Sequence, residues 1–344
     1  MKTIIDRAIP FIEGVLEPYG EVVYMDGSSI GAADVADADA LIIRTRTHCN
    51  EALLKGSKVR FVATATIGTD HIDLDFCQNN GIYVQNSAGC NAGGVMNYVL
   101  SAIYGSATRK RIHLAGSTVG IIGVGNVGSR VAANLQKLGF KVLLCDPPRA
   151  AAEGRGQFCD LDFLLRNSDI VTLHVPLNLS TYHMADARFF SKMKLGAIFV
   201  NASRGEVVVE DDLLQSITKL GAVIIDTWCN EPDVNKELVA KADIATPHIA
   251  GYSYQGKLIG TSMVVRSFAR FFGIKDLYDF FPALEEELRD AIKLEVRGKS
   301  EGEIAAMIQY NYPIFTDDFM FRMNPDGFES FREHYRYRRE FFID

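Results

Sequence analysis

The chain has 344 residues, which is enough for two domains of ordinary size and a smaller third part. Hydrophobic residues make up 48% of it and charged residues 23%, which is typical of a globular protein with a sizeable core and argues against a disordered chain. The net charge of −7 creates no overall basic field, so we expect neither nucleic acid nor a membrane surface as a partner.

The cysteines and the first residues indicate a cytoplasmic protein. The six cysteines are scattered without metal-ligand spacing, so we expect reduced thiols and no metal site. Asp6 and Arg7 interrupt the start before any apolar run develops, so we expect no signal peptide. No run approaches the roughly 18 uncharged apolar residues that a membrane span needs.

Short apolar runs alternate with helical patterns over the first 90 residues. Residues 40–45 (ALIIRT) and 59–65 (VRFVATA) predict buried strands, and NEALLKG between them predicts a short helix closed by Gly56. Strand, helix and strand in this order predict a parallel sheet. We therefore expect one α/β unit from the start of the chain to about Cys90.

A second α/β unit begins near residue 92 with the long helical pattern GGVMNYVLSAIYGSATRKR. The strand-like TVGIIGV, the helix-like NVGSRVAANLQKLG and the strand-like KVLLCD follow. Further β-rich runs occupy residues 169–177, 196–203, 222–228 and 244–249, and residues 211–221 predict a helix with acids in its first turn. This order predicts a doubly wound parallel-sheet domain of the Rossmann type.

The alternation fades after Gly251. KLIGTSMVVRSFARFFG predicts a long helix that carries the chain back to the first domain. Ser300 and Glu303 predict a capping box at the start of a later helix. For the arginines of the aromatic tail we expect a surface or an interface rather than a substrate site: Arg332, Arg336, Arg338 and Arg339.

Residues 123–128, GVGNVG, match the pattern G-x-G-x-x-G between a predicted strand and a predicted helix. Gly123 allows a tight turn, Gly125 lets the backbone approach a pyrophosphate at the helix N-terminus, and Gly128 lets the helix pack on the strand. Asp146 ends the next strand and would bind the ribose hydroxyls, which favours NAD over NADP. Arg149 is a counter-signal, because an arginine there can hold a 2′-phosphate.

Arg204, Glu231 and His248 each follow one of the last three β-rich runs. Ligands bind beyond the carboxyl ends of parallel strands, so we expect all three at one crevice. Arg204 would hold a carboxylate, His248 would remove a hydroxyl proton, and Glu231 would fix the tautomer of the ring. Each residue alone is more often structural, but together they suit hydride transfer at a carbon that bears a hydroxyl. Asp226 would hold the nicotinamide carboxamide.

The segments TATIGTDHID, GIYVQNSAGCNA, GIIGVGNVG and NASRGE and the Glu231/His248 pair resemble the D-isomer-specific 2-hydroxyacid dehydrogenases. The chain further resembles a subgroup that oxidises a 4-phosphorylated 2-hydroxy acid for vitamin B6 biosynthesis. This narrower resemblance rests on LIIRTRT, AGCNAGGVMNYV, LLCDPPRA, HIAGYSYQGK, LEVRG and FREHYRYRRE. The resemblance implies a flavodoxin-like substrate domain of residues 1–92 and 257–282 and an NAD-binding Rossmann domain of residues 93–256. It also implies a small α+β C-terminal dimerisation domain of residues 283–344, and hence a homodimer.

Carried over to this chain, the resemblance makes Arg204, Glu231 and His248 the catalytic residues. Contacts to NAD would come from the glycine loop with Asn126 and Val127, and from Asp146, Asp226 and Gly251. Contacts to the substrate would come from Thr45, Thr66 and Tyr252. Position 45 is threonine where the family has serine, and position 175 is valine where we expect a threonine that touches NAD.

Arg44 and Arg46 flank Thr45 and are candidates to hold a 4-phosphate, with solvated loop charge as the equal alternative. Two other functions stay open. One is a dehydrogenase of the same fold that acts on 3-phosphoglycerate or on glyoxylate and hydroxypyruvate. The other is a non-catalytic NAD-sensing protein that resembles a transcriptional corepressor. The C-terminal extension favours the phosphorylated four-carbon acid over the other dehydrogenases, and the lack of any segment that resembles a partner-docking or nuclear-targeting signal disfavours the corepressor.

Overall fold

A computed structural model describes residues 1–284 and 290–344, and the chain divides into two compact units. Unit 1 contains Met1–Asn91 and Tyr254–Asp290, and unit 2 contains Ala92–Ser253 and Ala291–Asp344. Most of the expected third domain of residues 283–344 groups with the second unit in this division, and its expected role as a dimerisation domain stays a prediction. Residues 285–289 of that expected domain lie outside the described residues.

Unit 1 is built on a parallel five-stranded sheet in the order β2-β1-β3-β4-β5. Its strands are β1 (Lys2–Asp6), β2 (Glu21–Met25), β3 (Ala40–Ile43), β4 (Phe61–Thr64) and β5 (Tyr83–Asn86). Alternate residues of β3 serve opposite faces, since Leu41 and Ile43 pack in one apolar cluster and Ala40 and Ile42 in another. This two-sided burial explains why residues 40–43 read as a continuous apolar run.

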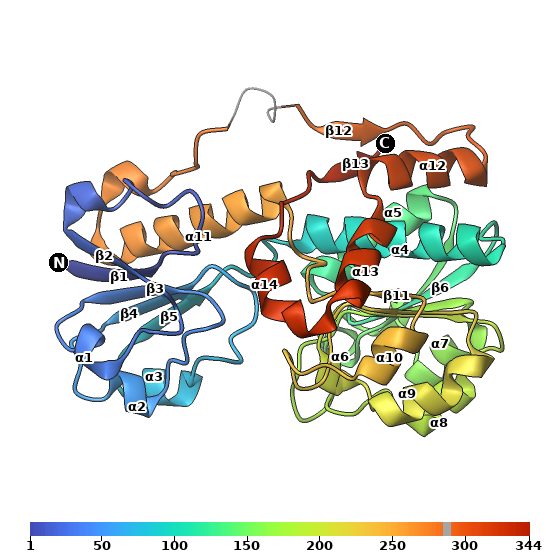
Figure 1. The fold of residues 1–344 in the computed structure, drawn as a ribbon, viewed down its shortest axis with the longest axis horizontal. Helices are drawn as coiled ribbons and strands as arrows, with labels where there is room; N and C mark the ends of the chain where they lie inside the picture. The colour runs from blue at the N-terminus through green and yellow to red at the C-terminus, as the bar shows by residue number, and fades with distance from the viewer. Residues whose placement is uncertain (285–289) are drawn as a thin grey trace. The chain divides into compact units, whose positions relative to one another are not determined.

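Helices cover both faces of this sheet. The short helices α1 (Ala32–Val35), α2 (Glu51–Leu54) and α3 (Leu74–Asn79) lie on one side, and α11 (Tyr254–Phe272) lies on the other (Figure 1). The return of the chain through α11 confirms the helix expected after Gly251. Tyr254 packs edge-on against Phe11, with 5.5 Å between the ring centroids.

Unit 2 is built on a parallel six-stranded sheet in the order β11-β10-β9-β8-β6-β7. Its strands are β6 (Thr118–Ile122), β7 (Lys141–Cys145), β8 (Ile170–Leu173), β9 (Ile198–Asn201), β10 (Ala222–Ile225) and β11 (Ile244–Ala245). β6 pairs with β7 on one side and with β8 on the other, so the chain reverses its direction of winding at β6. Such a switch point is where doubly wound sheets bind ligands.

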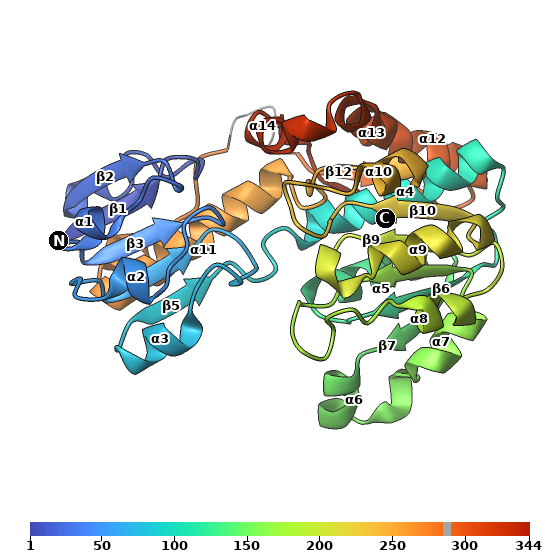
Figure 2. The same cartoon turned by 60° about the horizontal axis from the view of Figure 1, so that its bottom comes forward.

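Two layers of helices enclose the second sheet (Figures 1 and 2). One apolar cluster joins the sheet to α4 (Ala92–Lys110) and α5 (Asn126–Lys137). The other joins it to helices on the opposite face, among them α7 (Leu161–Asn167), α8 (Ala187–Lys192), α9 (Glu210–Ser216) and α10 (Lys236–Lys241). α6 (Pro147–Glu153) follows β7. The parallel sheet expected from the sequence is therefore present.

The C-terminal segment packs on unit 2. It contains β12 (Ile292–Leu294), α12 (Glu301–Asn311), α13 (Ile314–Met323), α14 (Phe328–Glu333) and β13 (Phe341–Ile343). β12 and β13 form a parallel two-stranded ribbon, and α12 and α13 pack against α4. Ser300 and Glu303 form the expected capping box at the start of α12. This packing joins residues 291–344 to unit 2.

Short 3-10 turns complete the described structure: Glu17–Tyr19, Arg155–Gln157, Gly205–Val207, Ile217–Lys219, Lys275–Leu277 and Pro325–Gly327. Within residues 1–284 and 290–344, no helix combines the length and apolar character that crossing a membrane requires. Over the same residues, no three histidine, cysteine, aspartate or glutamate side chains gather where they could hold a metal ion.

Candidate active site

The glycine loop lies at the switch point of unit 2, between β6 and α5. Gly123 has a φ of +84°, and a Cβ atom there would lie 2.5 Å from the carbonyl oxygen of His174, which follows β8. A Cβ atom on Gly128 would lie 2.0 Å from the carbonyl oxygen of Gly123. Both positions therefore require glycine, one for its conformation and one for the close approach of helix and loop.

The N-terminus of α5 fits a dinucleotide pyrophosphate. Gly125 caps the helix without a side chain, and a Cβ atom there would meet nothing within 4 Å. Gly125 and Asn126 are exposed, and Val127 is half-buried. The first amides of a helix have no partner within it and, with the helix dipole, favour an anion. The space beside Gly125 is the space that a phosphate would need.

Asp146 follows β7 and reaches back to the glycine loop. Its carboxylate accepts hydrogen bonds from the amide of Val124 at 2.8 Å and from the amide of Arg149 at 3.0 Å. The guanidinium of Arg149 binds Glu153 through two nitrogens at 2.6 and 2.7 Å, and a third nitrogen donates to the carbonyl of Val124. Because these contacts occupy Arg149, it is a weak candidate for binding a 2′-phosphate, and NAD is favoured.

Arg204 follows β9 and begins a turn that lies against the loop after β10. A Cβ atom on Gly205 would lie 1.9 Å from the carbonyl carbon of Trp228, so only glycine permits this approach. The side-chain Nδ2 of Asn201 donates to the carbonyl of Arg204 at 2.9 Å. The loop that carries Arg204 and the loop that carries Glu231 are thus in direct backbone contact.

Glu231 and His248 form a hydrogen-bonded pair. Nδ1 of His248 lies 2.7 Å from Oε2 of Glu231, and Oε1 of Glu231 accepts a hydrogen bond of 3.0 Å from the amide of Trp228. An ionised carboxylate only accepts, so the proton of a neutral ring sits on Nδ1 and Nε2 can take up another. Burial raises the pKa of Glu231, but the interactions with His248, the hydrogen bond from Trp228 and the charge of Arg332 together hold that pKa below its ordinary value.

Asp226 organises the loop of residues 248–252, which we name the histidine loop. This buried carboxylate accepts hydrogen bonds from the amide of Ile249 at 2.8 Å, the amide of Ala250 at 2.9 Å and the hydroxyl of Thr246 at 2.7 Å. Burial raises the pKa of Asp226, although these hydrogen bonds oppose the rise. The structure thus gives Asp226 a role in loop geometry, and its expected contact with the nicotinamide stays a prediction.

Tyr252 ends the histidine loop among aromatic side chains of the C-terminal segment. Its ring lies 6.0 Å from that of Tyr335 and 6.3 Å from that of Tyr337, measured between centroids. The guanidinium of Arg332 lies over the Tyr252 ring at 5.8 Å, and its charge helps to lower the pKa of Glu231. Gly251, expected to touch NAD, is half-buried in the same loop.

The two expected substrate threonines lie in unit 1. Thr45 is exposed in the turn after β3, between the half-buried Arg44 and the exposed Arg46. Thr66 follows β4, and its hydroxyl lies 2.6 Å from the hydroxyl of Thr64. Both threonines lie just beyond the carboxyl ends of neighbouring strands, where a parallel sheet binds ligands.

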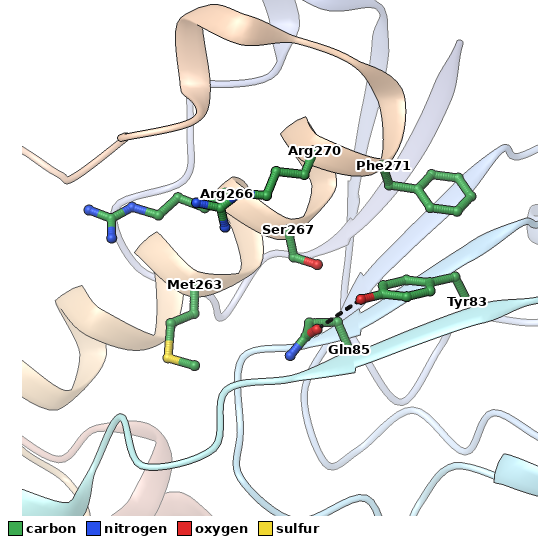
Figure 3. Close-up of a pocket in the computed structure, with 7 residues that line it drawn as sticks. All are labelled: Tyr83, Gln85, Met263, Arg266, Ser267, Arg270 and Phe271. Atoms are coloured by element: carbon green, nitrogen blue, oxygen red, sulfur yellow. Dashed lines mark hydrogen bonds between the residues drawn. The ribbon is translucent and has the colours of Figure 1, made fainter.

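A hollow of about 470 Å³ in unit 1 lies between the edge strand β5 and α11 (Figure 3). Its lining residues are Tyr83, Gln85, Met263, Arg266, Ser267, Arg270 and Phe271, and none of them is an expected site residue. Arg266 and Arg270 donate to backbone carbonyls of residues 278–280, which gives both arginines a structural role.

Two of the four tail arginines, Arg332 and Arg338, differ from expectation. Arg336 is exposed as expected. Arg338 instead donates to carbonyls of the histidine loop, and Arg332 stacks on Tyr252. The sequence could not show this, because an arginine-rich tail carries no signal for the carbonyls that it will meet.

Comparisons with known proteins place the chain in one family of dehydrogenases. Residues 97–250 match the family model of the D-isomer specific 2-hydroxyacid dehydrogenase, NAD binding domain. The chain is 42% identical to the erythronate-4-phosphate dehydrogenase of Bacteroides thetaiotaomicron, over 99% of this chain and 97% of that one. It is 40% identical to the enzyme of the same name from Escherichia coli O157:H7, over 99% and 92%.

Among solved structures, the NAD+-bound 3-phosphoglycerate dehydrogenase of Entamoeba histolytica is similar with a TM-score of 0.67 and 25% identity, over 81% of this chain and 97% of that one. An acyclic imino acid reductase in complex with NADPH and D-Arg shares the fold, with a TM-score of 0.70 and 21% identity, over 79% and 97%. The structural likenesses confirm the predicted α/β fold with its two parallel sheets, and the family model confirms the predicted NAD-binding domain.

Proposed function

Since this chain belongs to the D-isomer-specific 2-hydroxyacid dehydrogenase family, within the erythronate-4-phosphate dehydrogenases, we propose that it oxidises 4-phospho-D-erythronate to (R)-3-hydroxy-2-oxo-4-phosphobutanoate. The reaction would serve the biosynthesis of pyridoxal 5′-phosphate, vitamin B6. The observation that carries the proposal is the hydrogen-bonded pair of Glu231, which follows β10, and His248, which follows β11. Arg204 follows β9, which pairs with β10 in the same sheet.

His248 is the proposed acid/base. NAD, when bound, accepts a hydride from the carbinol carbon of the substrate. Nε2 of His248 takes the hydroxyl proton as the carbonyl forms, because Nδ1 already bears the proton shared with Glu231. The imidazolium that results is stabilised by the carboxylate of Glu231, which the hydrogen bond from Trp228 keeps in orientation. The return reaction would use the same proton.

Arg204 is proposed to orient the substrate. A guanidinium can bind a carboxylate through two parallel hydrogen bonds, which fixes both the position and the rotation of the neighbouring carbon. Its backbone is held in turn by Asn201, and by the close packing of Gly205 on Trp228. Such support suits a residue that must hold an acid group in one geometry.

The 4-phosphate and the remaining hydroxyls need donors of their own. Thr45, Thr66 and Tyr252 are the proposed substrate contacts, with Arg44 and Arg46 as the proposed cationic partners of the phosphate. We further propose that the C-terminal segment forms the dimer contact, as the subgroup resemblance implies. The length of chain shared with the curated relatives supports this, since 99% of this chain aligns with them.

A related dehydrogenase activity is the second candidate. The 25% identity to a 3-phosphoglycerate dehydrogenase, over 81% of this chain, favours a phosphorylated 2-hydroxy acid of different length. A substrate panel separates the two: 4-phospho-D-erythronate, 3-phospho-D-glycerate and D-lactate with NAD, and glyoxylate with NADH. We expect the four-carbon phosphate to give the highest kcat/KM by nicotinamide absorbance. A preference for D-lactate or 3-phospho-D-glycerate would contradict the assignment.

A further inference from the structure

The guanidinium of Arg338 is surrounded by backbone carbonyls of the histidine loop. Nη1 donates to the carbonyl of Ile249 at 3.0 Å and to that of Tyr252 at 3.2 Å. Nη2 donates to the carbonyl of Gly94 at 3.1 Å and to that of Ala250. Three of these four acceptors, those of Ile249, Ala250 and Tyr252, belong to the histidine loop. Five fixed N–H groups in one plane make arginine suited to such a cluster.

Asp226 binds the backbone N–H groups of the same loop. The carboxylate accepts from the amides of Ile249 and Ala250, while Arg338 donates to the carbonyls of these two residues. A loop outside regular structure has no ladder to satisfy its peptide groups, so side chains must do so. Here one acidic side chain accepts from the N–H groups of Ile249 and Ala250, and one basic side chain donates to the carbonyls of the same two residues.

Arg338 is itself held in place by the C-terminal segment. Its guanidinium lies 4.2 Å from the centroid of the Tyr312 ring and donates to the hydroxyl of Tyr335 at 3.3 Å. Asp317 accepts hydrogen bonds from the hydroxyls of both tyrosines, at 2.9 and 2.8 Å. A charge packed this closely costs stability unless it has fixed partners, so the surrounding residues restrict Arg338 to one position.

The backbone next to Arg338 is tied to the same region. Ser253 bridges to Arg338 through the main chain, and its hydroxyl donates to Glu340 at 2.6 Å. Asn97 exchanges two hydrogen bonds with the backbone of Phe341, at 2.8 and 3.0 Å. The end of the chain is thus bound to the end of the histidine loop and to α4.

His248 needs such support, because its φ of +55° lies in the left-handed region that side chains disfavour. We propose that Arg338 is a positioning residue of the dehydrogenase reaction: by holding the carbonyls of the histidine loop, it keeps His248 aligned with Glu231. The proposal rests on the proposed function and extends it. It gives the C-terminal segment a part in catalysis in addition to its proposed part in dimer contact.

The kinetic test compares Arg338→Met and Arg338→Lys with the matched control Arg336→Met, which alters an exposed arginine of the same segment. We expect Arg338→Met to lower kcat for the best substrate about 10- to 100-fold, with KM for NAD within about twofold. Arg338→Lys keeps the positive charge but has fewer N–H donors, so its kcat should lie between those of Arg338→Met and the wild type. Arg336→Met should match the wild type. Wild-type kcat in Arg338→Met would overturn the proposal.

A second readout needs no turnover, so it separates this proposal from the proposed function. Proton NMR of the folded protein reports the Nδ1 proton that His248 shares with Glu231, and His248→Asn identifies its signal. We expect the signal to shift or broaden in Arg338→Met and Arg338→Lys and to stay unchanged in Arg336→Met. An unchanged signal in both Arg338 variants would overturn the positioning role. A changed signal in a protein inactive on the whole panel would support the role and count against the proposed substrates.

Discussion

Asp226 and Arg338 bind opposite polar groups of the same two residues, with the carboxylate on the amides and the guanidinium on the carbonyls of Ile249 and Ala250. Between them lies the backbone that positions His248. The two side chains come from distant parts of the chain, one from the end of β10 and one from the tail. The acid/base geometry therefore depends on segments far apart in the sequence.

Replacing Glu231 by glutamine should slow catalysis without unfolding the protein. The amide can still accept a hydrogen bond from Nδ1, but it no longer stabilises an imidazolium by charge. We expect kcat to fall about 10- to 100-fold, since a hydrogen bond to a charged group contributes roughly 1.5 to 3 kcal/mol. The control is Glu237→Gln, because Glu237 forms an exposed ion pair with Lys241.

Asp146→Ala should weaken the binding of NAD and reduce the preference for NAD over NADP. The variant loses the proposed acceptor for the ribose hydroxyls and the negative charge that opposes a 2′-phosphate. We expect KM for NAD to rise about 10- to 100-fold, from a loss of roughly 1.5 to 3 kcal/mol. Asp160→Ala is a matched control, because Asp160 also caps a helix, α7, and accepts from the amide of Phe163 at 2.8 Å. Equal effects of both variants on KM would contradict the cofactor role.

Gly205→Ala should be strongly destabilising. A Cβ atom there would overlap the backbone of Trp228 at 1.9 Å, and neither loop can yield without moving Arg204 or Glu231. We expect a loss of at least about 3 kcal/mol in the free energy of unfolding, from the overpacking and the displaced backbone. Gly302→Ala, with nothing within 4 Å on α12, should instead be neutral or stabilising by up to about 1 kcal/mol. Urea unfolding measures both.

His174 should make the protein less stable as the pH falls. Burial lowers the pKa of His174 to about 3 from 6.5, so the unfolded chain binds the proton more readily than the folded one between these values. The free energy of unfolding then decreases as the pH drops below 6.5, by about 1 to 2 kcal/mol between pH 7 and pH 5.

His174→Gln should remove this part of the pH dependence, which urea unfolding at pH 5 and pH 7 measures directly. His113→Gln, at an exposed histidine, serves as the control and should keep the wild-type slope. An identical slope in all three proteins would show that His174 does not titrate in this way.

Much of the fold follows from local patterns. The continuous apolar run at residues 40–43 is typical of a strand buried on both faces, and β3 occupies Ala40–Ile43. The short strands β12 and β13 could not be predicted. Each has three residues, and they pair with each other across a long stretch of sequence, where no periodicity can develop.

The candidate site divides in the same way. Glu231 and His248 were expected together because each follows a strand of one parallel sheet, and the 2.7 Å contact between them has that origin. Arg338 was expected on a surface or an interface rather than at a substrate site. Its role depends on backbone carbonyls, which every residue has, so no residue pattern marks the place where they converge.

The most direct test of the central claim is hydride transfer from 4-phospho-D-erythronate that carries deuterium at C2. With the wild-type protein and NAD, we expect deuterium in the reduced nicotinamide and a primary isotope effect in a single turnover. The transfer should fall at least about 100-fold in His248→Asn, from loss of the general base. Reduced nicotinamide without deuterium, or wild-type transfer in His248→Asn, would contradict the account.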